Sequence, residues 1–472
     1  MFIGRTLELN QLKSFFLQNR AAIAVIYGRR RVGKSSLIRE AARGHHFFSF
    51  EGVEGQSRSK QIRIFIHQLR EHGVSDIPSD VKEWFELLPY LAELVNPNEP
   101  TVIVLDEFQW LGNYRQDIVS ELKLVWDQKL SHLPNLKLIL CGSVASFMVK
   151  KVVRSRALFG RCALSIDLQP FSLCETRALL ADKSEEEVLL AHQCVGGIPY
   201  YLSLLTDRSS VLLSLAFHCS TAASTFVTEF QKIFVSHFGK NALYESLIRA
   251  LKSRRYGASR AELIQDLHVS NSGYLTAALE DLEYAGMISS FVPYDKKRNS
   301  HTKRYVLVDR YLDFYLTFIE PLIQSGELGR INFISQVFET ACMVSWLGKS
   351  FELTCLREAS KIAGILGFGG IRFEAGPFFQ HGKKGDLVGV QFDLVFGRAD
   401  KVVTVCEVKC LDVPVPLSVG KHFAKQVDAV FDRSKVTVQR VLISKTAPSK
   451  ELENSHLFSS VIKLEDLLEA AK

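Results

Sequence analysis

Short runs of consecutive apolar residues alternate with longer amphipathic stretches over the first 170 residues. The clearest runs lie at 23–26, 102–105 and 138–141, and each contains four apolar residues without a polar interruption. Such runs are typical of strands buried on both faces of a parallel sheet. Shorter strands are expected at 45–50 and 164–168, with amphipathic helices among the segments 1–20, 57–71 and 80–95. This alternation predicts a parallel α/β sandwich.

The pattern changes to purely helical spacing over 172–235. Gly196 to Tyr200 interrupts it, and Pro199 is suited to the first turn of the next helix. Three helices follow, at 243–251, 259–268 and 270–285, and then two strands at 287–292 and 305–308. Three helices and a hairpin predict a winged helix-turn-helix.

The chain begins a new pattern after an apolar helix predicted at 310–323. A helix from about 335 is expected to hold Glu339, Trp346 and Glu352. The runs at 392–397 and 401–410 predict a β-hairpin within a C-terminal α/β domain. We therefore expect four parts: an α/β core (1–170), a helical lid (171–238), a winged helix (239–325) and a tail domain (326–472).

The segment between the first strand and its helix has the spacing G-x-x-x-x-G-K-S. In this setting the backbone N–H groups cradle phosphates at a helix N-terminus. Lys34 would reach the β- and γ-oxygens, and the Ser35 hydroxyl would bind Mg²⁺. The expected nucleotide-binding residues of the loop are Gly28, Arg29, Arg30, Arg31, Val32, Gly33, Lys34, Ser35 and Ser36. The other interpretation is a plain glycine turn. The helical lid would sit over the nucleotide, with Pro199 as a further candidate for contact with it.

Two carboxylates end the strand at 101–106. Asp106 would hold Mg²⁺ through water, and Glu107 would polarise the attacking water as a general base. Ligands bind at the carboxyl edge of such a sheet, which favours this interpretation over a simple helix cap.

Further residues could contact the γ-phosphate. Ser143 follows the strand near 136–142 and is a sensor candidate, although a strand-end turn explains it equally well. Arg154, Arg156 and Arg161 are candidates for an arginine finger, and a solvated basic face is the alternative.

The C-terminal hairpin gathers charged residues on one face. With a turn near Asp400, Asp393 lies opposite Glu407, and Lys409 shares the face of Glu407 by the two-residue period. This is the chemistry of a metal-dependent nuclease, in which Asp393 and Glu407 hold Mg²⁺ and Lys409 orients water. Glu352 could add a ligand and Gln426 could position the water. A cross-strand salt bridge is the alternative.

The winged helix predicts DNA as a partner. The loop at 294–304 has five Lys or Arg against one Asp, as a wing along phosphates would need. The third helix offers polar residues to DNA at its start but is acidic further along: Asn271, Ser272, Tyr274 and Thr276 precede Glu280, Asp281 and Glu283. A protein–protein spacer is the alternative.

Composition adds modest constraints. The net charge of +7 permits nucleic-acid binding without requiring it. None of the nine cysteines forms a C-x-x-C pair, which indicates neither a zinc site nor a disulfide framework. The chain has no signal sequence and no apolar run of membrane-spanning length, so we expect a cytoplasmic protein with no membrane partner; a homo-oligomer stays open.

Four segments together resemble the archaeal-type ATPases, a branch of the STAND class of P-loop NTPases related to AAA proteins. They are Phe2-Ile3-Gly4-Arg5 with Glu8, Tyr27 to Ser35, Leu105-Asp106-Glu107-Phe108-Gln109, and Gly196-Gly197-Ile198-Pro199-Tyr200. The resemblance implies an ATPase with Glu107 as the catalytic residue and with Gly4 and Arg5 near the nucleotide. The tail is similar to restriction-endonuclease-like folds with a PD-(D/E)xK core, although Phe392 stands where that pattern has proline.

The sequence thus predicts an ATP- and Mg²⁺-dependent switch that acts on DNA and carries a metal-dependent nuclease tail. One alternative keeps the ATPase but makes the tail a non-catalytic DNA or protein module. A P-loop kinase is a further alternative, disfavoured because two more domains follow and because Asp106-Glu107 suits water activation better than a phosphoryl acceptor pocket.

Overall fold

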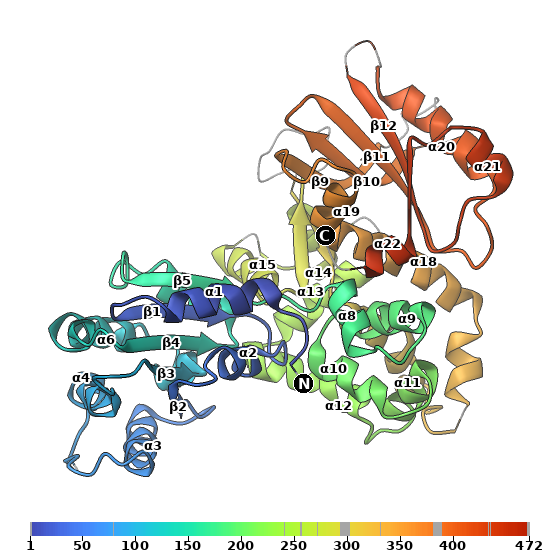
Figure 1. The fold of residues 1–472 in the computed structure, drawn as a ribbon. Helices are drawn as coiled ribbons and strands as arrows, with labels where there is room; N and C mark the ends of the chain where they lie inside the picture. The colour runs from blue at the N-terminus through green and yellow to red at the C-terminus, as the bar shows by residue number, and fades with distance from the viewer. Residues whose placement is uncertain are drawn as a thin grey trace. The chain divides into compact units, whose positions relative to one another are not determined.

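The computed structural model describes residues 2–78, 80–239, 241–254, 257–270, 272–292, 303–330, 332–380, 389–432, 434 and 436–469 (Figure 1). These residues form two compact units. The first contains 1–170 together with 276–286, and the second contains 171–275 and 287–472. Most of the predicted wing loop and Asn271 lie outside the described residues.

The first unit is built on a five-stranded parallel sheet, as predicted. Its strand order is β2-β3-β4-β1-β5. The strands are β1 (Ala22–Tyr27), β2 (His46–Glu51), β3 (Thr101–Asp106), β4 (Leu136–Gly142) and β5 (Cys162–Asp167). The three central strands are almost wholly buried and the two edge strands are partly exposed, which explains why only the central ones have continuous apolar runs.

Helices connect these strands and cover the sheet. They include α1 (Thr6–Phe16), α2 (Lys34–Ala41), α3 (Arg58–Glu71), α4 (Trp84–Leu87), α5 (Phe108–Leu111), α6 (Asp117–Gln128) and α7 (Ala145–Phe147), with η1 (Leu88–Leu94), η2 (Leu130–His132) and η3 (Met148–Val153). In α1, Leu12, Phe15 and Phe16 are buried, whereas Leu7 is 68% exposed.

The second unit begins with the predicted helices of the lid. They are α8 (Leu173–Leu179), α9 (Glu185–Val195), α10 (Pro199–Ser203), η4 (Leu204–Thr206), α11 (Val211–Cys219) and α12 (Thr225–Phe238). The break between α9 and α10 requires glycine, because a Cβ atom at Gly197 would lie 1.9 Å from the carbonyl oxygen of Phe171. Gly196 has a positive φ of 67°, which also favours glycine.

The elements of the predicted winged helix follow in the expected order. They are α13 (Ala242–Lys252), β6 (Ala258–Ser259), α14 (Arg260–Leu267), α15 (Gly273–Tyr284), β7 (Ile288–Phe291) and β8 (Arg304–Leu307), and then α16 (Arg310–Phe314), η5 (Tyr315–Ile319) and α17 (Glu320–Gln324). The antiparallel sheet has the order β6-β8-β7, so the short strand β6 joins the predicted hairpin.

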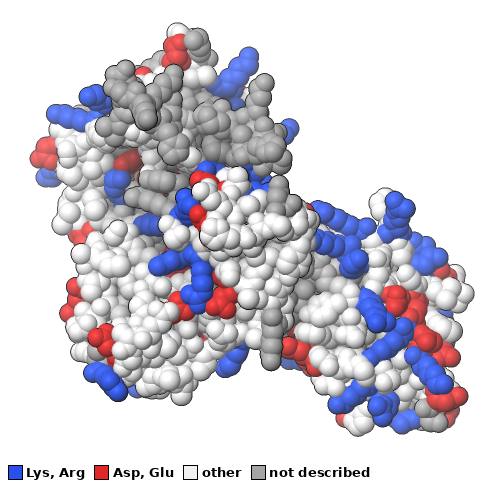
Figure 2. All heavy atoms as spheres, turned by 180° about the vertical axis from the view of Figure 1, so that it is seen from behind, with Lys and Arg blue, Asp and Glu red and all other residues white. Residues whose placement is uncertain are grey.

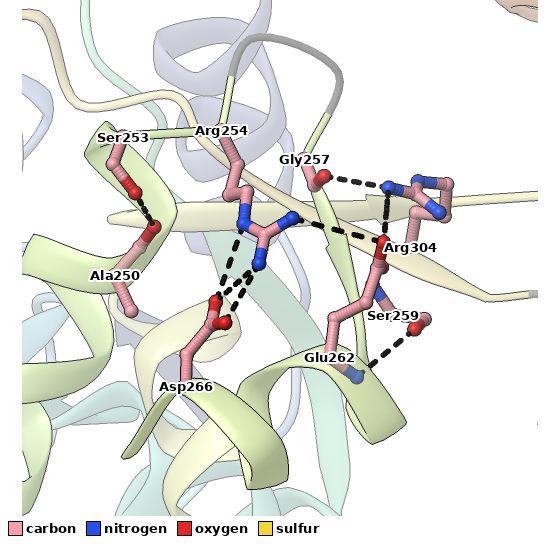
Figure 3. Close-up of polar contacts among 8 residues, drawn as sticks. All are labelled: Ala250, Ser253, Arg254, Gly257, Ser259, Glu262, Asp266 and Arg304. Atoms are coloured by element: carbon pink, nitrogen blue, oxygen red, sulfur yellow. Dashed lines mark hydrogen bonds and ion pairs between the residues drawn. The ribbon is translucent and has the colours of Figure 1, made fainter.

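Glu262 is central to a polar network at the base of the wing (Figure 3). Its carboxylate accepts a hydrogen bond from Ser259 N at 2.6 Å, and Ser259 Oγ accepts one from Glu262 N at 3.3 Å, so the two residues form a capping box at the start of α14. Arg304 lies 3.2 Å from the same carboxylate and donates to Gly257 O at 2.8 Å. Arg304, one of the five cations predicted to lie along phosphates, is therefore engaged within the protein.

Replacing Glu262 with Ala should loosen α14 and the adjacent strand. Loss of the capping box and of the Arg304 pair is expected to destabilise this region by about 1–2 kcal/mol. Amide hydrogen exchange in α14 should then accelerate about 5- to 30-fold. Asp266→Ala is the matched control on the same helix, because it removes only the surface pair with Arg254. Equal effects of the two substitutions would contradict this account.

The tail forms a mixed five-stranded sheet with the order β13-β12-β11-β10-β9. The strands are β9 (Phe373–Gln380), β10 (Val390–Arg398), β11 (Val402–Lys409), β12 (Thr437–Ser444) and β13 (Ser460–Lys463). The helical elements are η6 (Ile334–Phe338), α18 (Ala341–Arg357), α19 (Ala359–Ile365), α20 (Leu417–Val430), α21 (Lys450–Asn454) and α22 (Leu464–Leu468). Side chains of α20, β10 and β11 share one apolar core.

The hairpin of β10 and β11 is confirmed with its register. Leu394 pairs with Cys406, which places Asp393 opposite Glu407. The prediction that Glu339 lies in the long helix is wrong. Thr340 caps α18 by accepting a hydrogen bond from Met343 N, so the helix begins after Glu339.

Two global expectations can be compared with the structure. All nine cysteines are free thiols. None of the helices in the described part of the chain combines the length and hydrophobicity needed to span a lipid bilayer. Figure 2 shows basic side chains interspersed with acidic ones on the face in view, consistent with the modest net charge.

Candidate active site

The P-loop joins β1 to α2 and adopts a conformation that its glycines permit. A Cβ atom at Gly28, whose φ is 146°, would lie 2.4 Å from the carbonyl oxygen of Leu168. Gly33 has a φ of 92° and occupies the N-cap position of α2. The loop therefore ends at a helix N-terminus, where backbone N–H groups favour a phosphate.

Lys34 is buried at the first position of α2. Its ammonium donates hydrogen bonds to the carbonyl oxygens of Gly28, at 3.0 Å, and Arg29, at 3.1 Å. The ammonium group of Lys34 thus bonds to the backbone at the start of the P-loop.

Ser35 and Asp106 come together although 71 residues separate them. Ser35 Oγ donates to Asp106 Oδ2 at 2.9 Å. The pairing follows from the strand order, because β3, β4 and β1 are neighbours and their carboxyl ends lie at one edge. Hydroxyl and carboxylate oxygens are hard ligands that suit Mg²⁺. Burial raises the pKa of the Cys141 thiol of β4, and the charge of Asp106 adds to the rise.

Glu107 has a left-handed backbone conformation, with φ of 48°. Its Oε2 accepts hydrogen bonds from Ser143 Oγ at 2.7 Å and from the Gln109 amide. The backbone N–H of Ser143 lies 3.3 Å from the same oxygen. The sensor candidate therefore contacts the candidate base directly. Gln109 was not predicted to take part.

Arg5, next to Gly4, contacts the P-loop. Both have positive φ angles, and the buried Arg5 guanidinium donates to Val32 O at 3.0 Å. Arg29 is buried, whereas Arg30 is exposed and lies 3.7 Å from Glu54. Arg31 has a φ of 71°, and Ser36 is exposed at the start of α2. Contact of these residues with a nucleotide stays a prediction.

The three arginine-finger candidates differ. Arg161 donates two hydrogen bonds to the Asp127 carboxylate, at 2.7 and 2.8 Å, so it has a structural partner. Arg154 and Arg156 are exposed and stay candidates. Lys150, in the same region, lies 3.0 Å from Glu280 and 3.1 Å from Asp281, so these acidic residues of α15 are paired.

Pro199 begins α10 in the second unit. The preceding glycine segment is fixed by the hydrogen bond from Phe171 N to Gly197 O, at 2.6 Å. A contact of Pro199 with nucleotide stays a prediction.

The charged cluster of the tail consists of Asp393, Glu407 and Lys409, which the pairing of β10 with β11 brings together. Asp393 Oδ2 accepts a hydrogen bond from Val408 N at 3.0 Å, and Lys409 forms an ion pair with Glu407. Burial raises the pKa of Glu407; the Lys409 charge opposes that rise and the Asp393 charge adds to it. Burial alone would lower the pKa of Lys409, but Glu407, Asp393 and Glu352 together raise it. The net shift of the Lys409 pKa favours its ammonium form.

Other tail and winged-helix candidates are less tightly placed. Glu352 on α18 acts electrostatically on Lys409, whereas Gln426 is half-buried on α20. Tyr274 is 56% exposed near the start of α15, Thr276 on the same helix is also exposed, and Ser272, just before the helix, is half-buried. Within the described ranges, no group of three or more His, Cys, Asp or Glu side chains is arranged to hold a metal ion. The pair Asp393 and Glu407 would need water or substrate oxygens to complete a site.

Comparison with known proteins identifies the first part of the chain. Residues 2–205 match the family described as an ATPase domain predominantly from Archaea. This part of the chain is an archaeal-type P-loop ATPase domain. The match includes the P-loop, Asp106-Glu107 and the segment at 196–200, and it ends before the winged helix and the tail.

The individual proteins that are similar to this chain have low sequence identity to it. An uncharacterized protein of Methanocaldococcus jannaschii is 24% identical over 332 residues, which cover 70% of this chain and 71% of that protein. A Walker-type ATPase of Pyrococcus abyssi has 19% identity and a TM-score of 0.48, covering 67% of this chain and 96% of that one. The ORC2 protein of Aeropyrum pernix has 14% identity and a TM-score of 0.42, covering 68% and 94%.

Proposed function

We propose that this chain is an ATP-hydrolysing molecular switch whose nucleotide site is formed by the P-loop and the ends of β3 and β4. The observation that carries the proposal is the bond between Ser35 and Asp106, with Glu107 one residue further along the chain. Lys34, held in the centre of the loop, supplies the cation for the β- and γ-phosphates.

Ser35 and Asp106 are the residues that would hold Mg²⁺, Ser35 through its hydroxyl and Asp106 through water. When bound, Mg²⁺ neutralises charge on the β- and γ-phosphate oxygens. Glu107 orients the attacking water and accepts its proton. Because Ser143 donates to Glu107 at 2.7 Å, a Ser143 hydroxyl that turned to a γ-phosphate would release this carboxylate. Ser143 then couples phosphate recognition to the base.

The switch would act through the lid. We infer that ATP holds the segment at 196–200 against the α/β core and that hydrolysis releases it. The close packing of Gly197 on Phe171 supports this inference, because a rigid segment passes a displacement on to the helices it joins. The winged helix and the tail would be repositioned on DNA.

A second candidate function, DNA cleavage by the tail, is favoured by the juxtaposition of Asp393, Glu407 and Lys409. Asp393 and Glu407 would hold Mg²⁺ or Mn²⁺, and Lys409 would position water and offset the developing charge on phosphorus. The competing possibility is a non-catalytic tail that binds DNA or protein.

The test is cleavage of plasmid and branched DNA with Mg²⁺ or Mn²⁺, with and without ATP. Asp393→Asn and Lys409→Ala should each lower the cleavage rate by about 100-fold or more. Lys401→Gln, at the turn of the same hairpin, should cleave like the wild type. If the wild type hydrolyses ATP but cuts no DNA, the tail is a binding module.

A further inference from the structure

Helix α3 lies along β2, an edge strand of the N-terminal sheet (Figure 1). The N–H group of Gly52, directly after β2, donates to Asp106 O of the neighbouring strand β3 at 3.0 Å. Because hydrogen bonding to a parallel neighbour involves alternate residues, positions 51 and 53 direct their backbone groups away from β3. Backbone groups at the outer edge of a sheet need partners from outside that sheet.

Two glutamine side chains of α3 pair with these outward backbone groups. Gln68 accepts a hydrogen bond from Glu51 N at 3.2 Å and donates one to Glu51 O at 3.3 Å. Gln61 accepts from Val53 N at 3.1 Å and also donates to Val53 O. Each side-chain amide thus bonds both backbone groups of one residue, as a neighbouring strand would. The two glutamines lie two helical turns apart on the same face of α3.

Gly52, between the two paired residues, lies directly against the turn that carries Glu107. A Cβ atom at Gly52 would lie 2.7 Å from Glu107 O and 2.8 Å from Leu111 N, so this close approach requires glycine. Glu107 has a φ of 48°, and its carbonyl oxygen accepts a hydrogen bond from Trp110 N at 2.8 Å. The backbone of Gly52 therefore packs on the left-handed turn that orients the candidate base.

Helix α3 is itself firmly packed. Phe65 of α3 stacks on Phe50 of β2 with ring centroids 4.6 Å apart, and it contacts Trp84 edge-on at 5.3 Å. Gln61 is only 1% exposed. A buried amide that bonds two backbone groups cannot turn away without leaving polar groups unpaired. Residues 51–53 are therefore held in one position against the turn at Glu107.

We propose that Gln61, supported by Gln68, is a positioning residue that keeps Glu107 in the orientation needed to activate water. The two amides fix the residues on either side of Gly52, and Gly52 in turn supports the carbonyl side of Glu107. Gln61 acts through this backbone and does not touch the nucleotide. This inference rests on the proposed function, because the role of Glu107 as general base belongs to that proposal.

Gln61→Leu removes both bonds to Val53 and keeps a side chain of similar size. We expect kcat for ATP hydrolysis to fall about tenfold or more, and KM to stay within about twofold, because the P-loop is unchanged. Arg70→Met is the matched control. It removes a bond from the same helix to a backbone carbonyl, that of Ile77 at 3.4 Å, which lies outside the 51–53 segment. Its kcat should stay within about twofold of the wild type.

The deciding experiment repeats the substitution in a Glu107→Gln background, with single-turnover phosphate release from the full chain as the readout. Gln61→Leu should slow the Glu107→Gln protein by less than about twofold, because its effect is transmitted only through Glu107. A general loosening of the domain would slow both backgrounds equally. Gln68→Leu, at a half-buried position, should slow the wild type about fivefold with the same dependence on Glu107. It decides the question if Gln61→Leu does not fold.

The outcomes separate the positioning role from the proposed function. A wild type that releases no phosphate, or a Glu107→Gln variant that releases it at the wild-type rate, would overturn the role of Glu107 and the positioning role with it. A slow Glu107→Gln variant beside a Gln61→Leu variant of unchanged kcat would overturn the positioning role alone. Equal slowing by Gln61→Leu in both backgrounds would also overturn it.

Discussion

Glu107→Gln is expected to lower the rate of ATP hydrolysis by about 100-fold or more, while ATP still binds. Glutamine retains an oxygen that can accept the Ser143 hydrogen bond, so the backbone at the end of β3 should keep its conformation. It has no carboxylate to accept a proton from water. The measurement is phosphate release under saturating ATP, with ATP affinity determined by calorimetry on the same samples.

Glu99→Gln is the control for this substitution. Glu99 precedes β3, at the opposite end of the strand from Glu107, and its side chain is exposed beside His46. Its removal should leave ATP hydrolysis within about twofold of the wild type. Hydrolysis that survives in Glu107→Gln would show that another group activates the water.

Lys34→Ala should have the largest effect on nucleotide binding. The substitution removes the buried cation at the centre of the P-loop and leaves the Gly28 and Arg29 carbonyl oxygens without their ammonium partner. Loss of the ammonium group that would pair with the phosphate oxygens is expected to weaken ATP binding by about 100-fold or more. The rise in unfolding temperature that saturating ATP gives the wild type should then disappear.

Lys60→Ala is the matched control, because Lys60 is an exposed lysine on α3. It should keep the ATP-dependent rise in unfolding temperature. Unchanged ATP affinity in Lys34→Ala would show that nucleotide does not bind at the P-loop.

The N-terminal fold could be predicted because its central strands are buried on both faces. The runs at 23–26, 102–105 and 138–141 are continuously apolar and so lack the spacing of an amphipathic helix. All three lie in central strands of the sheet. The tail was harder to predict, and β9, β12 and β13 were missed. Strand β9 contains Gly376 and Pro377. Its place at the sheet edge tolerates these two residues, but they interrupt the sequence pattern by which a strand is predicted.

The residues of the nucleotide site that are placed by the ends of strands could be predicted from the sequence. Lys34, Ser35, Asp106 and Glu107 follow strands whose carboxyl ends share an edge, so their proximity follows from topology. The contacts of Gln109 and Gln61 could not be predicted in this way. A long amide side chain can turn in several directions, and only tertiary packing decides that Gln109 meets Glu107 and Gln61 meets Val53.

The central claim, that this chain is an ATP hydrolase with an oxygen-liganded Mg²⁺ at Ser35 and Asp106, is tested most directly by phosphate release from the purified full chain. ATP should be hydrolysed with Mg²⁺ present, hydrolysis should stop on addition of EDTA, and excess Mg²⁺ should restore it. Lys34→Ala should release no phosphate under any of these conditions. Hydrolysis that is unaffected by EDTA, or that persists in Lys34→Ala, would contradict the account.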